Sequence, residues 1–308
     1  MNSTSKCSTE SVPVIREHRI PTPGSKPYII TLGPDGNLWF CESGVSRIAR
    51  LSLKDGTFTE FVIPTRNSEP IGIITGADGN LWFTEHAGHK IGRITPDGQI
   101  TEFPLATANA GPDGIILGPD RNIWFSETDV AQIGKITLDG IVTEYATGIS
   151  PHSKPLAITV ADDDLWFSEA AGNRIGKITM TGVVSEYPAP SPDSGPRAIV
   201  LGPDRHLWFV ESVGNAIGRM DLEGNAVAFP LPRPGASPRG IALAPNGEFW
   251  ITENGINMVA RMTVTGQLLA EYPLPTAGCG PRAILVIPDG RVFFSKHDAG
   301  QIGEIVPE

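Results

Sequence analysis

The chain is poor in cysteine, in positive charge and in long apolar runs. Its 308 residues include three cysteines, an odd number too small for a disulfide framework. No stretch approaches the roughly 20 apolar residues that cross a bilayer, and the polar N-terminal residues lack the apolar core of a secretory signal. The 24 Lys and Arg against 34 Asp and Glu give a net charge of −10, the opposite of a nucleic-acid-binding surface. We therefore expect a cytoplasmic protein without a membrane or nucleic-acid partner.

Tryptophan, by contrast, recurs at a nearly fixed interval. Six positions carry the indole: Trp39, Trp82, Trp124, Trp166, Trp208 and Trp250. One further step of nearly the same length after Trp250 reaches Phe293. Each unit of roughly 42 residues holds four short apolar stretches separated by turn residues, which is the content of a propeller blade. The sequence therefore predicts an all-β fold, a seven-bladed β-propeller with four-stranded blades.

The two ends of the sequence complement each other. The last repeat starts at Cys279 and supplies only three strands, whereas Glu17–Pro21 matches Glu60–Pro64, the fourth strand of the first repeat. We therefore expect an N-terminal strand to complete the last blade, which closes the ring and removes an exposed sheet edge. The predicted organisation is a disordered tail at residues 1–14 and a single propeller at residues 15–308.

Two positions of each repeat are expected to face the mouth of the ring. The first is the residue after the proline of Pro-x-x-Ile, and it reads Tyr28, Ile71, Asp113, Leu156, Arg197, Arg239 and Arg282 along the chain. The second ends the tryptophan-containing strand, and it reads Glu42, Glu85, Glu127, Glu169, Glu211, Glu253 and Lys296. A glutamate present in six of seven repeats is most simply structural, holding loops or backbone amides.

Binding residues are expected where the repeat is broken. Arginine occupies the first mouth position in the last three repeats, and Tyr28 and Asp113 also differ from their apolar counterparts. Clustered guanidinium groups suit a carboxylate, a phosphate or a polarised carbonyl, so we expect these five residues to contact a substrate. The alternative is that each arginine pairs with a neighbouring mouth glutamate in a ring of salt bridges.

Histidine supplies the remaining candidates. Lys296, His297 and Asp298 stand in the last repeat where the others have glutamate and small residues, and they are the candidate catalytic groups. His86 and His152 fall in loops at the predicted mouth and are candidate substrate contacts. His86 could also join nearby side chains around a metal ion, although a solvated loop is the commoner reason for such a spacing.

The repeat resembles the streptogramin B lyase (virginiamycin B lyase) family over residues 15–308. The resemblance rests on segments such as Leu81–Glu85 (Leu-Trp-Phe-Thr-Glu), Ile91–Thr95 (Ile-Gly-Arg-Ile-Thr) and Thr101–Leu105 (Thr-Glu-Phe-Pro-Leu). It implies a seven-bladed propeller that opens a cyclic depsipeptide antibiotic by Mg²⁺-dependent elimination, and hence antibiotic resistance. That reaction requires a base, an acid for the leaving oxygen and a cation for the enolate-like charge.

The chain departs from the family at the implied catalytic positions. The resemblance implies histidine after the proline in the last two blades, where this chain has Arg239 and Arg282, and a metal-binding glutamate within 294–298, where it has none. One expectation is a monomeric enzyme for a cyclic peptide ester, a lactone or a related small molecule. Its base would be His297 or Asp298, and the two arginines would replace the metal. The other is a non-catalytic propeller that binds an anionic ligand or a protein partner through an arginine-rich mouth.

Overall fold

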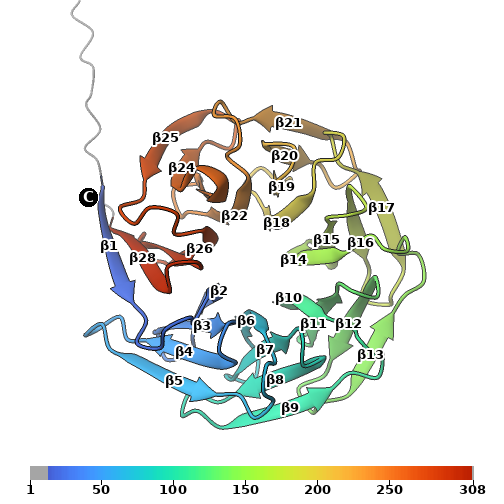
Figure 1. Cartoon of the computed structure of the whole chain (residues 1–308). Helices are drawn as coiled ribbons and strands as arrows, with labels where there is room; N and C mark the ends of the chain where they lie inside the picture. The colour runs from blue at the N-terminus through green and yellow to red at the C-terminus, as the bar shows by residue number, and fades with distance from the viewer. Residues whose placement is uncertain (1–12, 307–308) are drawn as a thin grey trace, which may run out of the picture.

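Seven four-stranded antiparallel sheets form a closed ring (Figure 1). The computed structural model describes residues 13–306. Apart from the single turn of 3₁₀-helix at Asn254–Ile256, the regular structure in this range is β-strand. The described residues contain no helix long and apolar enough to cross a membrane. The predicted seven-bladed propeller is therefore confirmed.

Six blades use strands that are consecutive in the sequence. In the first three the strands are β2 (Pro27–Leu32), β3 (Leu38–Glu42), β4 (Arg47–Leu51) and β5 (Phe58–Val62); β6 (Pro70–Thr75), β7 (Leu81–Glu85), β8 (Lys90–Ile94) and β9 (Ile100–Pro104); and β10 (Pro112–Leu117), β11 (Ile123–Glu127), β12 (Gln132–Ile136) and β13 (Val142–Tyr145). In the next three they are β14 (Pro155–Ala161), β15 (Asp164–Glu169), β16 (Arg174–Ile178) and β17 (Val184–Pro188); β18 (Pro196–Leu201), β19 (Leu207–Glu211), β20 (Ala216–Met220) and β21 (Ala226–Pro230); and β22 (Pro238–Leu243), β23 (Phe249–Glu253), β24 (Met258–Met262) and β25 (Leu268–Pro273).

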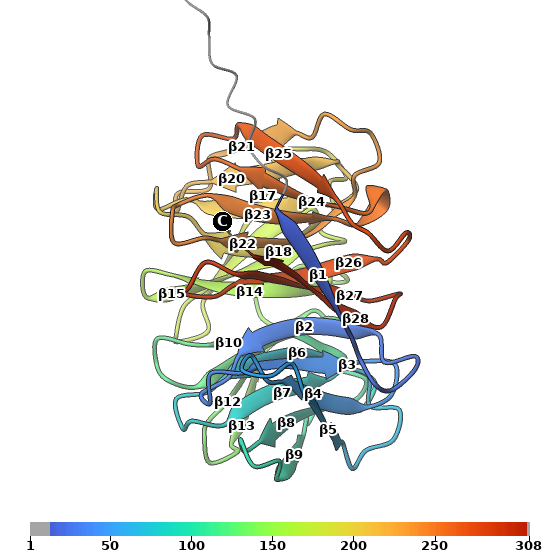
Figure 2. The same cartoon turned by 90° about the vertical axis from the view of Figure 1, so that its left-hand side faces the viewer.

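The seventh blade joins the two ends of the described chain. It contains β26 (Pro281–Val286), β27 (Val292–Lys296), β28 (Gln301–Val306) and, at its outer edge, β1 (Val14–Arg19). Figure 2 shows β1 alongside β28, with which it pairs from Val14 opposite Val306 to Arg19 opposite Gln301. The predicted ring closure is therefore confirmed. The strand begins one residue before the predicted start at 15, and residues 1–12, predicted as a disordered tail, lie outside the described residues.

Aromatic side chains on the second strand of each blade fill the space between blades. The Trp82 indole stacks on Phe103 of the fourth strand, with ring centroids 5.4 Å apart, and its N–H donates to Asp78 at 3.2 Å. Phe83 lies flat against Gly92, where an added Cβ would fall 2.0 Å from the ring. Glycine gives the phenylalanine ring the room it occupies in this blade, whereas the first blade has Ala49 opposite Phe40.

The six glutamates expected at the mouth are buried inside the blades, and among the described residues only Glu211 holds a loop amide as the sequence predicted. All six side chains are buried, and in five of them both carboxyl oxygens lack a hydrogen-bond partner among residues 13–306. Glu127 is representative: burial, with the added charge of Glu144 on the fourth strand, raises its pKa to about 8. The carboxyl group is therefore neutral at pH 7, because ionisation would place two negative charges together inside the blade.

The fifth and seventh blades differ from the other five, because neither has a glutamate both here and at the corresponding position of the fourth strand. In the fifth blade that position is Ala228, and Glu211 instead accepts hydrogen bonds from the Ser191 hydroxyl at 2.6 Å and its amide at 3.3 Å. In the seventh blade the position is Glu17, and it forms a partly buried ion pair with Lys296. The partner of the inner residue thus depends on what the outer strand supplies.

Proton uptake by these glutamates makes stability depend on pH. Such a carboxyl group has a higher pKa in the folded protein than in the unfolded chain. Its contribution to the free energy of unfolding is fully present below the pKa of the unfolded chain and is lost as the pH rises through the pKa of the folded protein. For Glu127 this window runs from 4.5 to about 8. We expect Glu127→Gln to melt near the wild-type temperature at pH 5 and several degrees above it at pH 8. Thermal denaturation at both pH values measures the difference.

Glu211→Gln is the matched control for this prediction. Its carboxylate already has the Ser191 donors, so the substitution is expected to lower the melting temperature without a gain at pH 8. A Glu127→Gln effect that is the same at both pH values would show that Glu127 is ionised in the folded protein.

Candidate functional site

The first strands of the blades converge on a cavity of about 180 Å³ at the ring axis. Each of these strands has a register shift after its first proline, as between Pro196 and Ile199, because two residues there leave the regular ladder. Six of the seven residues in this position line the cavity: Tyr28, Asp113, Leu156, Arg197, Arg239 and Arg282. The periodicity of the sequence therefore identified the axial residues, although their binding role stays a prediction.

Small residues allow the strands to come this close. An added Cβ on Gly114 would fall 2.1 Å from the Leu156 carbonyl oxygen, and one on Gly240 would fall 2.3 Å from that of Arg282. The residue two places after the proline is Gly or Ala in six repeats, and only Ile29 differs. This run of small residues is visible in the sequence and indicates a narrow axial cavity.

The three arginines lack ion-pair partners among the described residues, although the charge of Asp113 attracts Arg197. Among residues 13–306 no carboxylate forms an ion pair with Arg197, Arg239 or Arg282, and the Nε atoms of the last two are buried without a hydrogen-bond partner. Burial, and then the charges of the other two arginines, lowers the pKa of Arg239. The expected alternative of a salt-bridge ring is wrong, because the mouth glutamates are turned into the blades.

Tyr28 links the arginines to the last blade. The Arg282 guanidinium carbon lies 5.0 Å from the centroid of the Tyr28 ring, and His297 meets the same ring edge-on with centroids 5.9 Å apart. Burial, reinforced by the Asp113 charge, raises the pKa of Tyr28. The phenol therefore stays protonated and is a hydrogen-bond donor toward the cavity.

His297 and Asp298 form a hydrogen-bonded pair beside Tyr28. The His297 Nδ1 lies 2.7 Å from the Asp298 carboxylate, which can only accept, so Nδ1 carries the proton and Nε2 keeps its lone pair. Burial, with a smaller contribution from Arg282, lowers the pKa of His297. The imidazole is thus neutral at pH 7 and has the protonation state of a general base.

Lys296 does not lie at the cavity. Its side chain is 0% exposed, and its ammonium is held by Glu17 and by the Gln301 side chain at 2.8 Å. Gln301 comes from β28, the strand next to β27, and Glu17 comes from β1 beyond it, so the lysine fixes the closing strand. A catalytic role, which the sequence predicted, does not fit this position.

Of the other three predicted substrate contacts, one lines the cavity. Asp113 lines the cavity opposite the arginines, and burial raises its pKa to about 6 even though His86 and Arg197 favour the charged form. His86 stands behind it, with Nε2 3.6 Å from Asp129. His152 is exposed in the loop before β14 and is not part of the cavity lining.

The described residues do not fit a Mg²⁺ ion at the mouth. Magnesium prefers carboxylate oxygens, and Asp113 is the one acidic residue of the cavity lining, which also holds three guanidinium groups. Within residues 13–306 no group of three or more His, Cys, Asp or Glu side chains could hold a metal. The arginines therefore supply the positive charge here.

The whole length of the propeller matches one known family. The profile of the Virginiamycin B lyase family matches residues 7–161 and 146–308. The chain belongs to this family. A streptogramin B lyase structure is 37% identical, with a TM-score of 0.90, covering 95% of this chain and 97% of that one. Virginiamycin B lyase from Staphylococcus aureus is 35% identical, with a TM-score of 0.91, covering 96% and 99%.

A further Staphylococcus aureus structure is a catalytically inactive histidine-to-alanine variant of virginiamycin B lyase with quinupristin. It is also 35% identical, with a TM-score of 0.91, and covers 96% of this chain and 99% of that one. No curated protein matches the chain. Within the virginiamycin B lyase family, this chain thus combines the shared fold with an arginine-lined cavity.

The unpaired arginines predict a stability cost at this cavity. Because like charges without counter-ions repel one another, we expect Arg239→Gln to raise the melting temperature at low salt, with a smaller gain at high salt. Arg47→Gln is the control, since Arg47 forms an ion pair with Glu60 at 2.9 Å and its loss should lower the melting temperature. A comparable fall for Arg239→Gln would mean that this arginine holds the mouth together.

Proposed function

We propose that the chain is a lyase that binds a small ester, such as a cyclic peptide ester or a lactone, in the axial cavity. The substrate class is one whose carbonyl or carboxylate oxygens face the arginines. The observation that carries this proposal is a cavity lined by three arginines without ion-pair partners among the described residues, with the His297–Asp298 pair in contact with Tyr28 of its lining. Membership of the virginiamycin B lyase family supports the same reaction class.

Elimination assigns a separate task to each group. The His297 Nε2 would take the proton α to a carbonyl, and the electron pair of that C–H bond would form a C=C bond as the β C–O bond breaks. Arg239 and Arg282 would stabilise the negative charge that develops on the carbonyl oxygen. The ester oxygen leaves as part of a carboxylate, which Arg197 can hold by paired hydrogen bonds. The product has the mass of the substrate.

A binding function without catalysis is the second candidate. It is favoured by the position of His297, which contacts Tyr28 but does not itself line the cavity. In this case the arginines would hold an anionic ligand, and no bond would break. The two candidates share the ligand chemistry and differ only in turnover.

Incubation with quinupristin followed by liquid chromatography and mass spectrometry tests the lyase. We expect a product of unchanged mass and altered retention, formed equally with and without EDTA because the cavity has no metal ligand set. His297→Gln and Arg239→Gln are each expected to slow turnover by at least about 100-fold. Arg205→Gln, which removes an exposed arginine paired with Asp162, is the control and should leave turnover unchanged.

The other outcomes separate the two candidates. A product heavier by one water would indicate hydrolysis and overturn the elimination. Absence of turnover, together with a citrate-induced rise in melting temperature that Arg239→Gln removes, would support the binding function. If citrate stabilises Arg239→Gln as much as the wild type, neither candidate uses this cavity.

The pH profile tests the assignment of the base. Because the pKa of His297 lies below the ordinary 6.5, its Nε2 is already available at neutral pH. Turnover should therefore stay level from pH 8 down to pH 6.5 and fall only below that value. Asp298→Asn removes the carboxylate that raises this pKa, so the fall should move to still lower pH in that variant.

A further inference from the structure

The axial cavity carries opposite charges on opposite sides. Asp113 lies at the start of β10 in the third blade, and this strand lies across the ring from β22 and β26 (Figure 1). Those two strands begin with the prolines that precede Arg239 and Arg282, and β18 carries Arg197 at the same position. Leu156 of the fourth blade stands between Asp113 and Arg197 in the order of the blades. All five residues line the same cavity, which therefore has a negative side and a positive side.

The carboxyl group of Asp113 is available to a ligand. The backbone carbonyl oxygen of this residue accepts a hydrogen bond from the Thr84 hydroxyl at 2.9 Å, which fixes the start of β10. The carboxyl oxygens, by contrast, form no hydrogen bond and no ion pair within residues 13–306. Burial raises the pKa of this group to about 6, so it is largely ionised at pH 7. An ionised carboxylate only accepts hydrogen bonds, and leaving it without a donor is costly.

The groups behind Asp113 make this side of the cavity attractive to a cation. Asp129 and Glu69 act on Asp113 as negative charges, and His86 acts on it as the one positive charge from the same side. The His86 Nε2 lies 3.6 Å from Asp129, and its Nδ1 is buried without a hydrogen-bond partner among the described residues. Three carboxyl groups thus stand against one imidazole, whereas the opposite side holds guanidinium groups.

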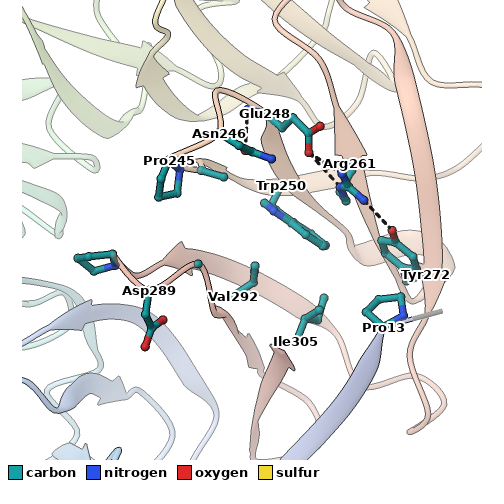
Figure 3. A pocket seen from close by; sticks show the side chains of 13 residues that line it. Pro13, Pro245, Asn246, Glu248, Trp250, Arg261, Tyr272, Asp289, Val292 and Ile305 are labelled. Atoms are coloured by element: carbon teal, nitrogen blue, oxygen red, sulfur yellow. Dashed lines mark hydrogen bonds and ion pairs between the residues drawn. The ribbon is translucent and has the colours of Figure 1, made fainter. Parts of the chain in front are cut away.

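A larger cavity of the described residues has no such polarity. It has a volume of about 490 Å³ and lies between the sixth and seventh blades (Figure 3). Its charged groups are paired: Arg261 donates to Glu248 at 2.7 Å and to the Tyr272 hydroxyl at 3.2 Å, and Asp289 accepts from Arg291 at 2.9 Å. Of these two cavities, only the axial one presents charges of both signs that lack ion-pair partners within residues 13–306.

We propose that the axial cavity binds a small molecule that carries a protonated amine together with a carboxylate or an ester carbonyl. The amine lies against Asp113, and the oxygens lie against Arg239 and Arg282. This rests on the axial cavity being the site of the proposed function, and it adds the amine to the substrate class. The cavity of about 180 Å³ has the volume of roughly six water molecules, which suits the two polar ends of one short chain.

Three ligands with the same four-carbon chain test the proposal. 4-Aminobutyrate has both charges, butyrate has only the carboxylate, and butylamine has only the amine. Affinities are measured by following the melting temperature during titration at neutral pH and constant ionic strength. We expect 4-aminobutyrate to bind at least about tenfold more tightly than butyrate, because its amine supplies the donor that Asp113 lacks. Butylamine should not stabilise the protein, because the arginines repel it.

Substitutions then assign each end of the ligand to its side of the cavity. Asp113→Asn should reduce the affinity for 4-aminobutyrate to that for butyrate, without weakening butyrate. Arg239→Gln should weaken both ligands. Asp163→Asn is the matched control, because Asp163 is exposed in the turn between β14 and β15 and should affect neither ligand. Each shift is compared with the same variant without ligand, so a change in stability alone does not count as binding.

The remaining outcomes separate this proposal from the proposed function. It would be overturned if the wild type bound butyrate and 4-aminobutyrate equally, if 4-aminobutyrate gave no stabilisation at millimolar concentration, or if Asp113→Asn kept the preference. In these cases butyrate binding that depends on Arg239 would still support the arginines as the anion site. A preference lost in Asp113→Asn but unaffected by Arg239→Gln would count against the arginines, and so against both proposals.

Discussion

The insertion of one large aromatic side chain between each pair of blades is the constraint on which the rest of the structure depends. In five blades a phenylalanine of the second strand packs against a glycine of the third, as Phe83 does against Gly92, and in the other two the facing residue is Ala49 or Ala260. A small residue at this position in every blade makes room for the large side chains that pack as the ring closes. The closure in turn determines how near the first strands approach the axis, and therefore the size of the cavity there.

Charge is distributed in opposite ways inside the blades and at the axis. The blades bury carboxyl groups in pairs and avoid the cost of two charges by keeping one of them protonated, as Glu127 beside Glu144 illustrates. The axial cavity instead holds three arginines and, among its lining residues, the single carboxyl group of Asp113. A protein of net charge −10 thus gathers positive charge at its axis. An anionic group entering this cavity would replace repulsion with attraction, which is why the site points to a ligand and not to a structural network.

The seventh blade shows how a repeat fold handles the ends of its chain. In the other six blades a hairpin turn joins the third and fourth strands, whereas this blade depends on the pairing of β1 with β28 and on the partly buried ion pair of Lys296 with Glu17. The exchange of glutamate for lysine in the last repeat is therefore explained by the fold. It compensates for a neighbour that arrives from the far end of the sequence.

The sequence alone determined the number of blades, the closing strand and the axial position of Arg197, Arg239 and Arg282. All of these follow from a period that is visible in the spacing of tryptophans. The sequence could not determine which partner each charged group would find, because pairing depends on distances between residues far apart in the chain. Lys296 was a catalytic candidate until Glu17, 279 residues away, was seen beside it, and the pairing of the arginines with the glutamates stayed an open alternative until the glutamates were seen buried in the blades. Periodicity fixes where a residue lies in its own repeat, whereas only the closed ring decides what it faces.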